Sequence, residues 1–298
     1  MPEDLSTILE SPEHTLLATG LGATEGPLWH PDGYLTLVDL GGRLLKWDPS
    51  DGISVVRENT GEGNGCTFDR QGNLIMCEGA DHRCITRMTP DGTVTTIADR
   101  YQGKRLNKPN DVVCRSDGSI YFTDPSLRVP AEDREYGFAG VFRIAPDGQL
   151  HLATDGCEYP NGLAFSPDES VMYVAITRTS EACFGEKDRG EFCAHMKIRA
   201  FDVAPDGSLI NNRIFADMSS AEAGVPDGMK VDVEGRLYCT GPGGVWVFDP
   251  DGNKLGVISG PESPRNLAFG GDDFRTVYTT PGESLYSFRV KTPGIKPY

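Results

Sequence analysis

Six polar residues occupy the same position in a pattern that recurs along the chain, and they are the strongest candidates for chemistry. In each copy the polar residue is followed four residues later by an apolar residue and eight residues later by a turn, usually with glycine. We call this polar position the axial position, and it holds Glu25, Asn64, Asn110, Asn161, Asp227 and Arg265. Two carboxylates and three amides form an oxygen-only donor set of the kind that hard divalent cations prefer. If the fold brings them together, they can hold such a cation.

A simpler interpretation is that these polar side chains only hydrate the mouth of a channel, because Asn-Gly and Asp-Gly are common turn dipeptides. We favour that interpretation for Asn64. For Glu25, Asn161 and Asp227 we favour the metal, because two carboxylates crowded together need a counter-charge.

The elements that must position these residues are short β-strands. Apolar runs such as YLTLVD, SIYFTD and VMYVAI alternate with Asp-Gly turns, and no segment has the pattern of a long amphipathic helix. Successive axial positions are 38 to 66 residues apart, and each repeat holds four strands and two tight turns. Such repeats predict an all-β, six-bladed β-propeller with four antiparallel strands per blade. The first strand of each blade lines the channel, so the six axial positions should meet at one end of the axis.

The two ends of the chain are expected to close the ring. The sixth repeat lacks an obvious fourth strand, and the segment 14–18 (HTLLA) resembles the fourth strands of other repeats. We therefore expect this N-terminal strand to complete the last blade and cover its edge. Residues 1–298 are then predicted to form a single domain.

Residues that could contact a substrate lie on the same face as the axial positions. Fourteen residues after an axial position, at the end of the second strand, come Asp39, Glu78 and Asp124. Long connections at 99–109, 125–140 and 177–196 surround this face and suggest a specificity surface. We predict Arg105, Asn107, Asn110 and Asp124 as substrate-binding residues. Turn acids at strand ends and a solvated basic loop at Lys104, Arg105 and Asn107 remain the alternatives.

Composition limits the partners of the protein. With 28 Lys and Arg against 44 Asp and Glu, the net charge is −16, which disfavours nucleic acid. The sequence has no long apolar run and no secretory signal pattern, so we expect no membrane partner and a cytoplasmic location. The eight cysteines show no metal-binding spacing, and buried thiols are expected. Nothing in the pattern separates a monomer from a homodimer.

Four motifs in a fixed order resemble the SMP-30/gluconolactonase/luciferin-regenerating-enzyme-like family over about residues 22–288. They are EGP at Glu25, RLNKPNDVV around Asn110, YPNGLAFSPD around Asn161 and PDGM around Asp227. The resemblance implies a six-bladed propeller with a divalent metal on its axis and, typically, lactone hydrolysis. It places metal ligands at Glu25, Asn161 and Asp227, a ligand or substrate contact at Asn110, and the general base at Asp227.

The expected function is therefore metal-dependent hydrolysis of a sugar-type (aldono) lactone to the hydroxy acid. One divalent cation is implied, with calcium first and magnesium, manganese or zinc as alternatives. Hydrolysis of an organophosphate or phosphotriester at the same site is the enzymatic alternative. A non-catalytic calcium-binding propeller is the third possibility, because a fold does not fix a function.

Overall fold

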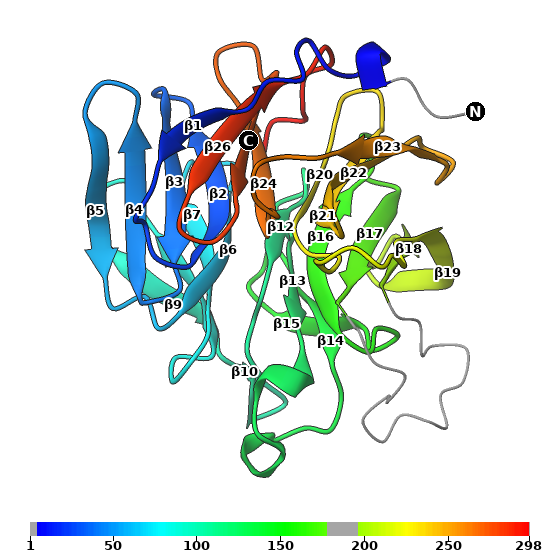
Figure 1. The fold of residues 1–298 in the computed structure, drawn as a ribbon. Coiled ribbons are helices and arrows are strands. Elements are labelled where there is room, and N and C mark those ends of the chain that lie inside the picture. The colour runs from blue at the N-terminus through cyan, green and yellow to red at the C-terminus, as the bar shows by residue number, and fades with distance from the viewer. Residues whose placement is uncertain (1–4, 178–195, 298) are drawn as a thin grey trace.

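A ring of six four-stranded antiparallel sheets makes up the computed structural model, which describes residues 5–177 and 196–297 (Figure 1). The predicted six-bladed propeller is confirmed. Blades one to three consist of β2 (Thr24–His30), β3 (Tyr34–Asp39), β4 (Arg43–Asp48) and β5 (Gly52–Glu58); β6 (Gly63–Phe68), β7 (Leu74–Glu78), β8 (Cys84–Met88) and β9 (Val94–Ala98); and β12 (Val112–Cys114), β13 (Ile120–Asp124), β14 (Gly140–Ile144) and β15 (Leu150–Thr154). Blades four to six consist of β16 (Pro160–Phe165), β17 (Val171–Ile176), β18 (Lys197–Val203) and β19 (Leu209–Asp217); β20 (Met229–Val231), β21 (Leu237–Gly241), β22 (Gly244–Phe248) and β23 (Lys254–Ile258); and β24 (Asn266–Gly270), β25 (Thr276–Thr280), β26 (Leu285–Arg289) and β1 (Thr15–Ala18).

The N-terminal strand closes the ring, as the sequence predicted. β1 pairs antiparallel with β26, with Thr15 opposite Ser287 and Leu16 opposite Tyr286. The connection to the first blade is fixed to the last one, since the Thr24 amide donates to the Gly282 carbonyl at 2.8 Å. Blade six is thus built from both ends of the chain, and its β26 edge is not left open.

Turns of the predicted Asp-Gly type join the strands. In each, the glycine has a positive φ, for example 90° at Gly118 and 85° at Gly148. In several of them the preceding aspartate accepts a hydrogen bond from the backbone amide two residues on: Ser119 N donates to Asp117 Oδ1 at 2.8 Å and Gln149 N to Asp147 Oδ1 at 3.0 Å. Glycine relieves the left-handed backbone and the aspartate satisfies an amide, which is why this dipeptide recurs.

The apolar core lies between the blades. Strands in the middle of each sheet are buried on both faces, because a neighbouring blade covers each face. Aromatic pairs connect adjacent blades: Tyr121 meets Phe165 edge-on at 5.3 Å, and Tyr238 meets Phe269 at 5.2 Å. The ring is therefore held by side-chain packing across sheets, whereas hydrogen bonds hold each sheet.

Short elements outside the sheets lie mostly on the rim. They are the hairpin β10 (Arg100–Tyr101) with β11 (Lys104–Arg105), and the single-turn helices η1 (Leu5–Thr7), η2 (Ser126–Arg128) and η3 (Ala131–Asp133). Nowhere in 5–177 or 196–297 is there a helix with the length and apolarity to span a bilayer. Six cysteines in these ranges are free, and five of them are buried. Cys183 and Cys193 lie outside the described residues.

Glycine after the axial position lets the six inner strands (β2, β6, β12, β16, β20 and β24) meet around the channel. Each inner strand contacts the next, and β24 returns to β2. The residue after the axial position is glycine in four repeats, including Gly162 and Gly228. A Cβ on Gly162 would lie 2.1 Å from the carbonyl oxygen of Asp227 in the next blade. The close approach of the inner backbones thus requires a residue without a side chain there.

The first prediction concerns this approach. Gly162→Ala should lower the free energy of unfolding by about 1–3 kcal/mol, because the new methyl group overlaps backbone that cannot move freely. Gly137→Ala is the matched control, since Gly137 is exposed and a Cβ there meets nothing within 4 Å. Denaturant unfolding of both variants measures the difference. Equal stability of the two variants would contradict the role given to Gly162.

Candidate active site at the end of the axis

The polar side chains predicted to meet do lie at the same end of the six inner strands. Glu25 and Asn161 are the second residues of β2 and β16, while Asn110 and Asp227 come two residues before β12 and β20. Glu25, Asn110 and Asn161 are each 5% exposed, and Asp227 is partly exposed. Since the inner strands contact one another in a ring, their starts surround one end of the channel. Asn64 lies there too.

The amide of Asn161 is oriented by a short chain of hydrogen bonds. The Thr177 hydroxyl donates to the carbonyl of Pro226, so its lone pair is left to accept from Asn161 Nδ2 at 2.7 Å. This fixes the nitrogen side of the amide. Asn161 Oδ1 is buried and accepts no hydrogen bond from any described residue. A buried carbonyl oxygen without a donor is costly unless something else pairs with it.

Glu25 is held in a similar one-sided way. Its Oε2 accepts from Asn266 Nδ2 at 3.1 Å and from the Gly26 amide at 3.3 Å. Burial raises the pKa of Glu25, and these hydrogen bonds offset part of that effect. Both bonds end on Oε2, and no hydrogen bond from another described residue to Oε1 is present.

Asp227 completes the arrangement. Its backbone amide is bonded to the carbonyl of Thr240 at 3.1 Å, which fixes the residue against β21. Burial, and next the charge of Glu25, hold the pKa of Asp227 well above its usual range, while Arg128 and Arg265 act in the opposite direction. Two carboxylates that raise each other's cost of ionisation are a site for a positive charge.

A third carboxylate, Asp111, was missed by the sequence analysis. It is buried, and its Oδ1 accepts from the Val112 amide at 2.8 Å. Its charge raises the pKa of both Glu25 and Asp227. The signal was present: where four repeats have glycine after the axial position, this repeat has Asp111 and the last has Asn266. Both exceptions act at the site, since Asn266 is the donor to Glu25.

The donor set fits a hard divalent cation. Glu25, Asp227 and the unpartnered Asn161 Oδ1 supply carboxylate and carbonyl oxygens, and no Lys or Arg in the described ranges forms an ion pair with Glu25, Asp111 or Asp227. Those ranges contain no cluster of three or more His, Cys, Asp and Glu placed to hold a metal. The candidate set does not depend on such a cluster, because two of its four members, Asn110 and Asn161, are amides. Oxygen ligands of this mixed kind suit calcium.

The predicted substrate residues on the rim are placed differently. Asp124 is fully buried, and its Oδ2 accepts from the Asn107 amide at 2.8 Å and from the Tyr136 hydroxyl. Asn107 is also fully buried, and its Nδ2 donates to the Phe138 carbonyl at 3.1 Å. The two side chains connect the 99–109 and 125–140 segments beneath the surface. Their position is that of supports for the rim.

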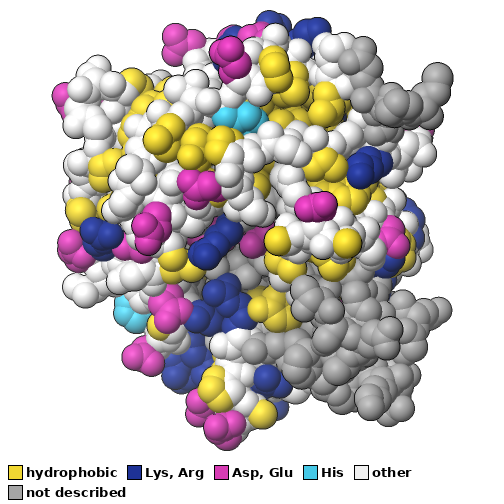
Figure 2. All heavy atoms as spheres, viewed as in Figure 1, with side chains coloured by type: hydrophobic (Ala, Val, Ile, Leu, Met, Phe, Trp, Pro, Cys, Tyr) yellow, Lys and Arg dark blue, Asp and Glu magenta, His cyan; other side chains and the backbone are white. Residues whose placement is uncertain are grey.

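Arg105 lies on β11 at the rim. Its guanidinium donates to the carbonyl of Asp81 at 2.6 Å, and its amide donates to Glu135 at 2.8 Å. Figure 2 shows Lys and Arg side chains gathered low on the molecule, around the place where Figure 1 has β10. Asp and Glu side chains lie among them, and Arg100 and Lys108 form ion pairs with Glu135 and Glu62. Of the 177–196 connection, only Thr177 and Met196 lie within the described residues.

Asp39 and Glu78, which end the second strands of blades one and two, have local partners. Asp39 accepts from Arg43 Nε at 2.8 Å and from the Gly41 amide at 2.9 Å. Glu78 is bonded to Arg57 at 2.6 Å and to Thr86 at 2.8 Å. These bonds agree with the turn-acid alternative for both residues.

Comparison with known proteins identifies the family. The family model described as "SMP-30/Gluconolactonase/LRE-like region" matches residues 23–282. This chain belongs to that family. Among its family relatives, a gluconolactonase of Zymomonas mobilis is 31% identical over 98% of this chain and 83% of the relative. A pentonolactonase of Haloferax volcanii is 30% identical over 86% of this chain and 80% of the relative. The solved structure of a gluconolactonase from Xanthomonas campestris has a TM-score of 0.83 and 35% identity, covering 96% of this chain and 92% of that one.

The second prediction follows from the crowded carboxylates. In excess chelator, Glu25→Gln should be more stable than the unaltered protein by about 1 kcal/mol or more, about 2 °C in Tm, because a buried charge is removed. In excess Ca²⁺ the order should reverse, since only the unaltered site binds the ion fully. Glu13→Gln, which removes the same charge at an exposed position, should change neither value. Thermal unfolding in the two buffers gives the difference in Tm between Glu25→Gln and the unaltered protein under each condition. A Glu25→Gln protein that is less stable than the unaltered one in chelator would contradict the account.

The third prediction uses the pH dependence of Asp124. Burial raises the pKa of Asp124 to about 6, so the folded protein keeps this proton where the unfolded chain has lost it. Its contribution to stability is therefore present below about pH 4 and is lost as the pH rises through about 6. Relative to Asp124→Asn, the unaltered protein should lose about 2 kcal/mol between pH 4 and pH 7.

The control for that experiment is Asp168→Asn. Hydrogen bonds from Ser166 and Ser170 lower the pKa of Asp168 to about 2, so its proton is lost in both states above pH 5. The difference from the unaltered protein should then be constant between pH 5 and pH 7. Denaturant unfolding across the pH range provides the free energies of unfolding. If the difference between the unaltered protein and Asp124→Asn were also constant with pH, Asp124 would be ionised throughout and the prediction would be wrong.

Proposed function

We propose that this protein is a metal-dependent lactonase that hydrolyses a sugar-type (aldono) lactone to its hydroxy acid. The observation that carries the proposal is the convergence of Glu25, Asp227 and the unpartnered Asn161 Oδ1 at one end of the axis. The lactonases among its family relatives, which match this chain over most of its length, support the choice of reaction.

Four residues are assigned to the cation: Glu25, Asn110, Asn161 and Asp227. Calcium is the first choice and magnesium, manganese or zinc are the alternatives, because the donors are oxygen atoms. When bound, a divalent cation supplies Lewis-acid polarisation of the lactone carbonyl and charge compensation for the oxygen that becomes negative. Thr177 and Asn266 orient two of the ligands, and such supporting bonds tune a metal site.

Asp227 is assigned as the general base. Burial and the charge of Glu25 raise the pKa of Asp227, which makes its carboxylate a stronger proton acceptor than an exposed aspartate. It takes a proton from the attacking water as the C–O bond to water forms. The proton is then available to the ring oxygen when the ester C–O bond breaks, and the product is the open hydroxy acid.

The rim is assigned to substrate binding. Asn110 is close to the axis, and Arg105 lies on the rim. Asn107 and Asp124 are buried, so we expect them to hold the substrate-facing segments in place through Tyr136 and Phe138. The charged and polar side chains of this rim favour a polar substrate rich in oxygen atoms.

The fourth prediction tests the function directly. Proton release from a panel of aldono-lactones should require added divalent cation, and Asp227→Asn should lower kcat by about 10²–10⁴-fold. Asp91→Asn, at an exposed turn, is the control and should keep full activity. A phosphotriester substrate is included as a separate arm.

The possible results distinguish the alternatives. Lactone turnover at the same rate in chelator would refute metal dependence. Faster turnover of the phosphotriester than of any lactone would favour the organophosphate alternative. Calcium binding without turnover of either substrate would favour a non-catalytic propeller.

A further inference from the structure

A second cavity occupies the other end of the channel. It has a volume of about 340 Å³, within the range of small-ligand sites, and the residues that line it include none of Glu25, Asn110, Asn161 and Asp227. All six inner strands contribute to it. The residues three positions after each axial position form one layer of its wall: Leu28, Thr67, Val113, Ala164, Lys230 and Ala268.

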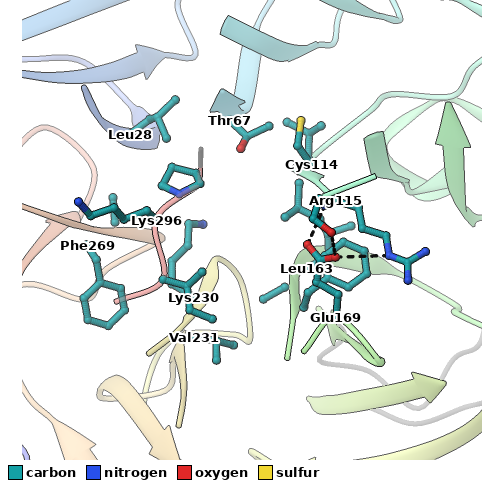
Figure 3. A pocket seen from close by; sticks show the side chains of 18 of the residues that line it. Leu28, Thr67, Cys114, Arg115, Leu163, Glu169, Lys230, Val231, Phe269 and Lys296 are labelled. Carbon is teal, nitrogen blue, oxygen red and sulfur yellow. Dashed lines mark hydrogen bonds and ion pairs between the residues drawn. The ribbon is translucent and has the colours of Figure 1, made fainter. Parts of the chain in front are cut away.

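Lys230 is the only charged residue of this layer. Its side chain lies inside the ring of inner strands in Figure 3, whereas the Arg115 guanidinium turns outward to Glu169. The Lys230 ammonium donates to the Met229 carbonyl at 3.0 Å, and no carboxylate of the described residues is within ion-pair distance of it. Arg115, in contrast, has Asp117 at 3.2 Å and Glu169 at 3.7 Å. Lys230 is thus a half-buried cation with no carboxylate in contact among the described residues, and the acid on which its charge acts is Asp111, whose pKa it lowers.

The charge of the whole lining has the same sign. Four of the lining residues are basic and one, Glu169, is acidic, in a chain with net charge −16. The basic residues are Arg70, Arg115, Lys230 and Lys296. A concave surface of this kind raises the local concentration of anions.

The C-terminal segment forms the edge of the cavity beside Lys230. The Ile295 amide donates to the Val231 carbonyl at 3.0 Å, so the segment is tied to β20, and Ile295, Lys296 and Pro297 line the opening. Lys296 is exposed, and its ammonium lies 4.9 Å from the ring centre of Phe274. Apolar walls and one inward ammonium therefore define the chemistry of the interior.

We propose that this cavity binds a small organic anion with one carboxylate and an apolar body, such as a medium-chain fatty acid. The carboxylate pairs with Lys230 in a charge-assisted hydrogen bond, and the hydrocarbon packs against Leu28, Val113 and Ala268. A polyhydroxy acid, the product of the proposed reaction, does not suit these walls because its hydroxyl groups would lose hydrogen bonds there. The inference is independent of the proposed function.

Titration calorimetry with sodium hexanoate on the calcium-loaded, full-length protein provides the fifth prediction. Hexanoate should bind one site per chain, and Lys230→Met should weaken binding at least about tenfold. Lys296→Met, which removes an exposed lysine at the opening, should change binding less than about threefold. Hexan-1-ol, which has the same chain without the charge, should bind the unaltered protein at least about tenfold more weakly, a comparison that needs no variant.

A second arm separates this cavity from the axial site. If the anion occupies the cavity, Asp227→Asn should bind hexanoate as the unaltered protein does. Binding that is lost in Asp227→Asn and kept in Lys230→Met would place the carboxylate at the axial end and overturn the inference. So would equal binding of hexanoate and hexan-1-ol, or no saturable binding up to about 10 mM.

Discussion

Three carboxylates at one end of the channel, two of them buried and the third, Asp227, partly exposed, are the constraint on which the site depends. Glu25, Asp111 and Asp227 come from three different inner strands or the residues just before them, and the charge of Asp111 raises the pKa of the other two. Removing such groups from water costs free energy unless an opposite charge compensates. The positive charges nearby are Arg128, Arg265 and, for Asp111, Lys230, but none of them forms an ion pair with these carboxylates within the described residues. The folded chain therefore gathers carboxyl groups whose ionisation is disfavoured until a positive charge is bound beside them.

The architecture explains why this charge can be kept in place. Each inner strand is fixed by its own sheet and by the neighbouring blades, so the site residues do not have to hold the ring together. Glycines such as Gly162 and Gly228 let the backbones approach, and the exceptions Asp111 and Asn266 put side chains where the other repeats have none. The position after the axial residue thus allows close packing in the four blades where it is glycine. In the other two blades the same position supplies a side chain to the site. The same logic applies three residues after the axial position, where Lys230 is charged and its five counterparts are not.

The sequence was sufficient for the fold and for the common end of the inner strands at which the axial positions lie. Asp-Gly turns and the spacing of apolar runs depend on local backbone preferences, which the sequence states directly, and they predicted six blades and the closing strand. The axial residues followed because equivalent positions of a ring meet at its axis. Asp124 shows where this argument ends: the repeat placed it at a strand end with Asp39 and Glu78, but it did not show that Asn107 and Tyr136 donate hydrogen bonds to it. Contacts between segments far apart in sequence decide burial, and the repeat pattern does not contain them. The orientation of Asn161 by Thr177 was hidden for the same reason.

The central claim is that one hard cation sits between Glu25, Asn161 and Asp227. Anomalous X-ray scattering from crystals grown with Ca²⁺ tests it most directly, because the signal locates the ion without reference to activity. The account predicts a single strong peak on the propeller axis, about 2.3–2.6 Å from Asn161 Oδ1 and from carboxylate oxygens of Glu25 and Asp227. A fully calcium-loaded crystal with no peak there, or with its peak bound by other residues, would contradict it.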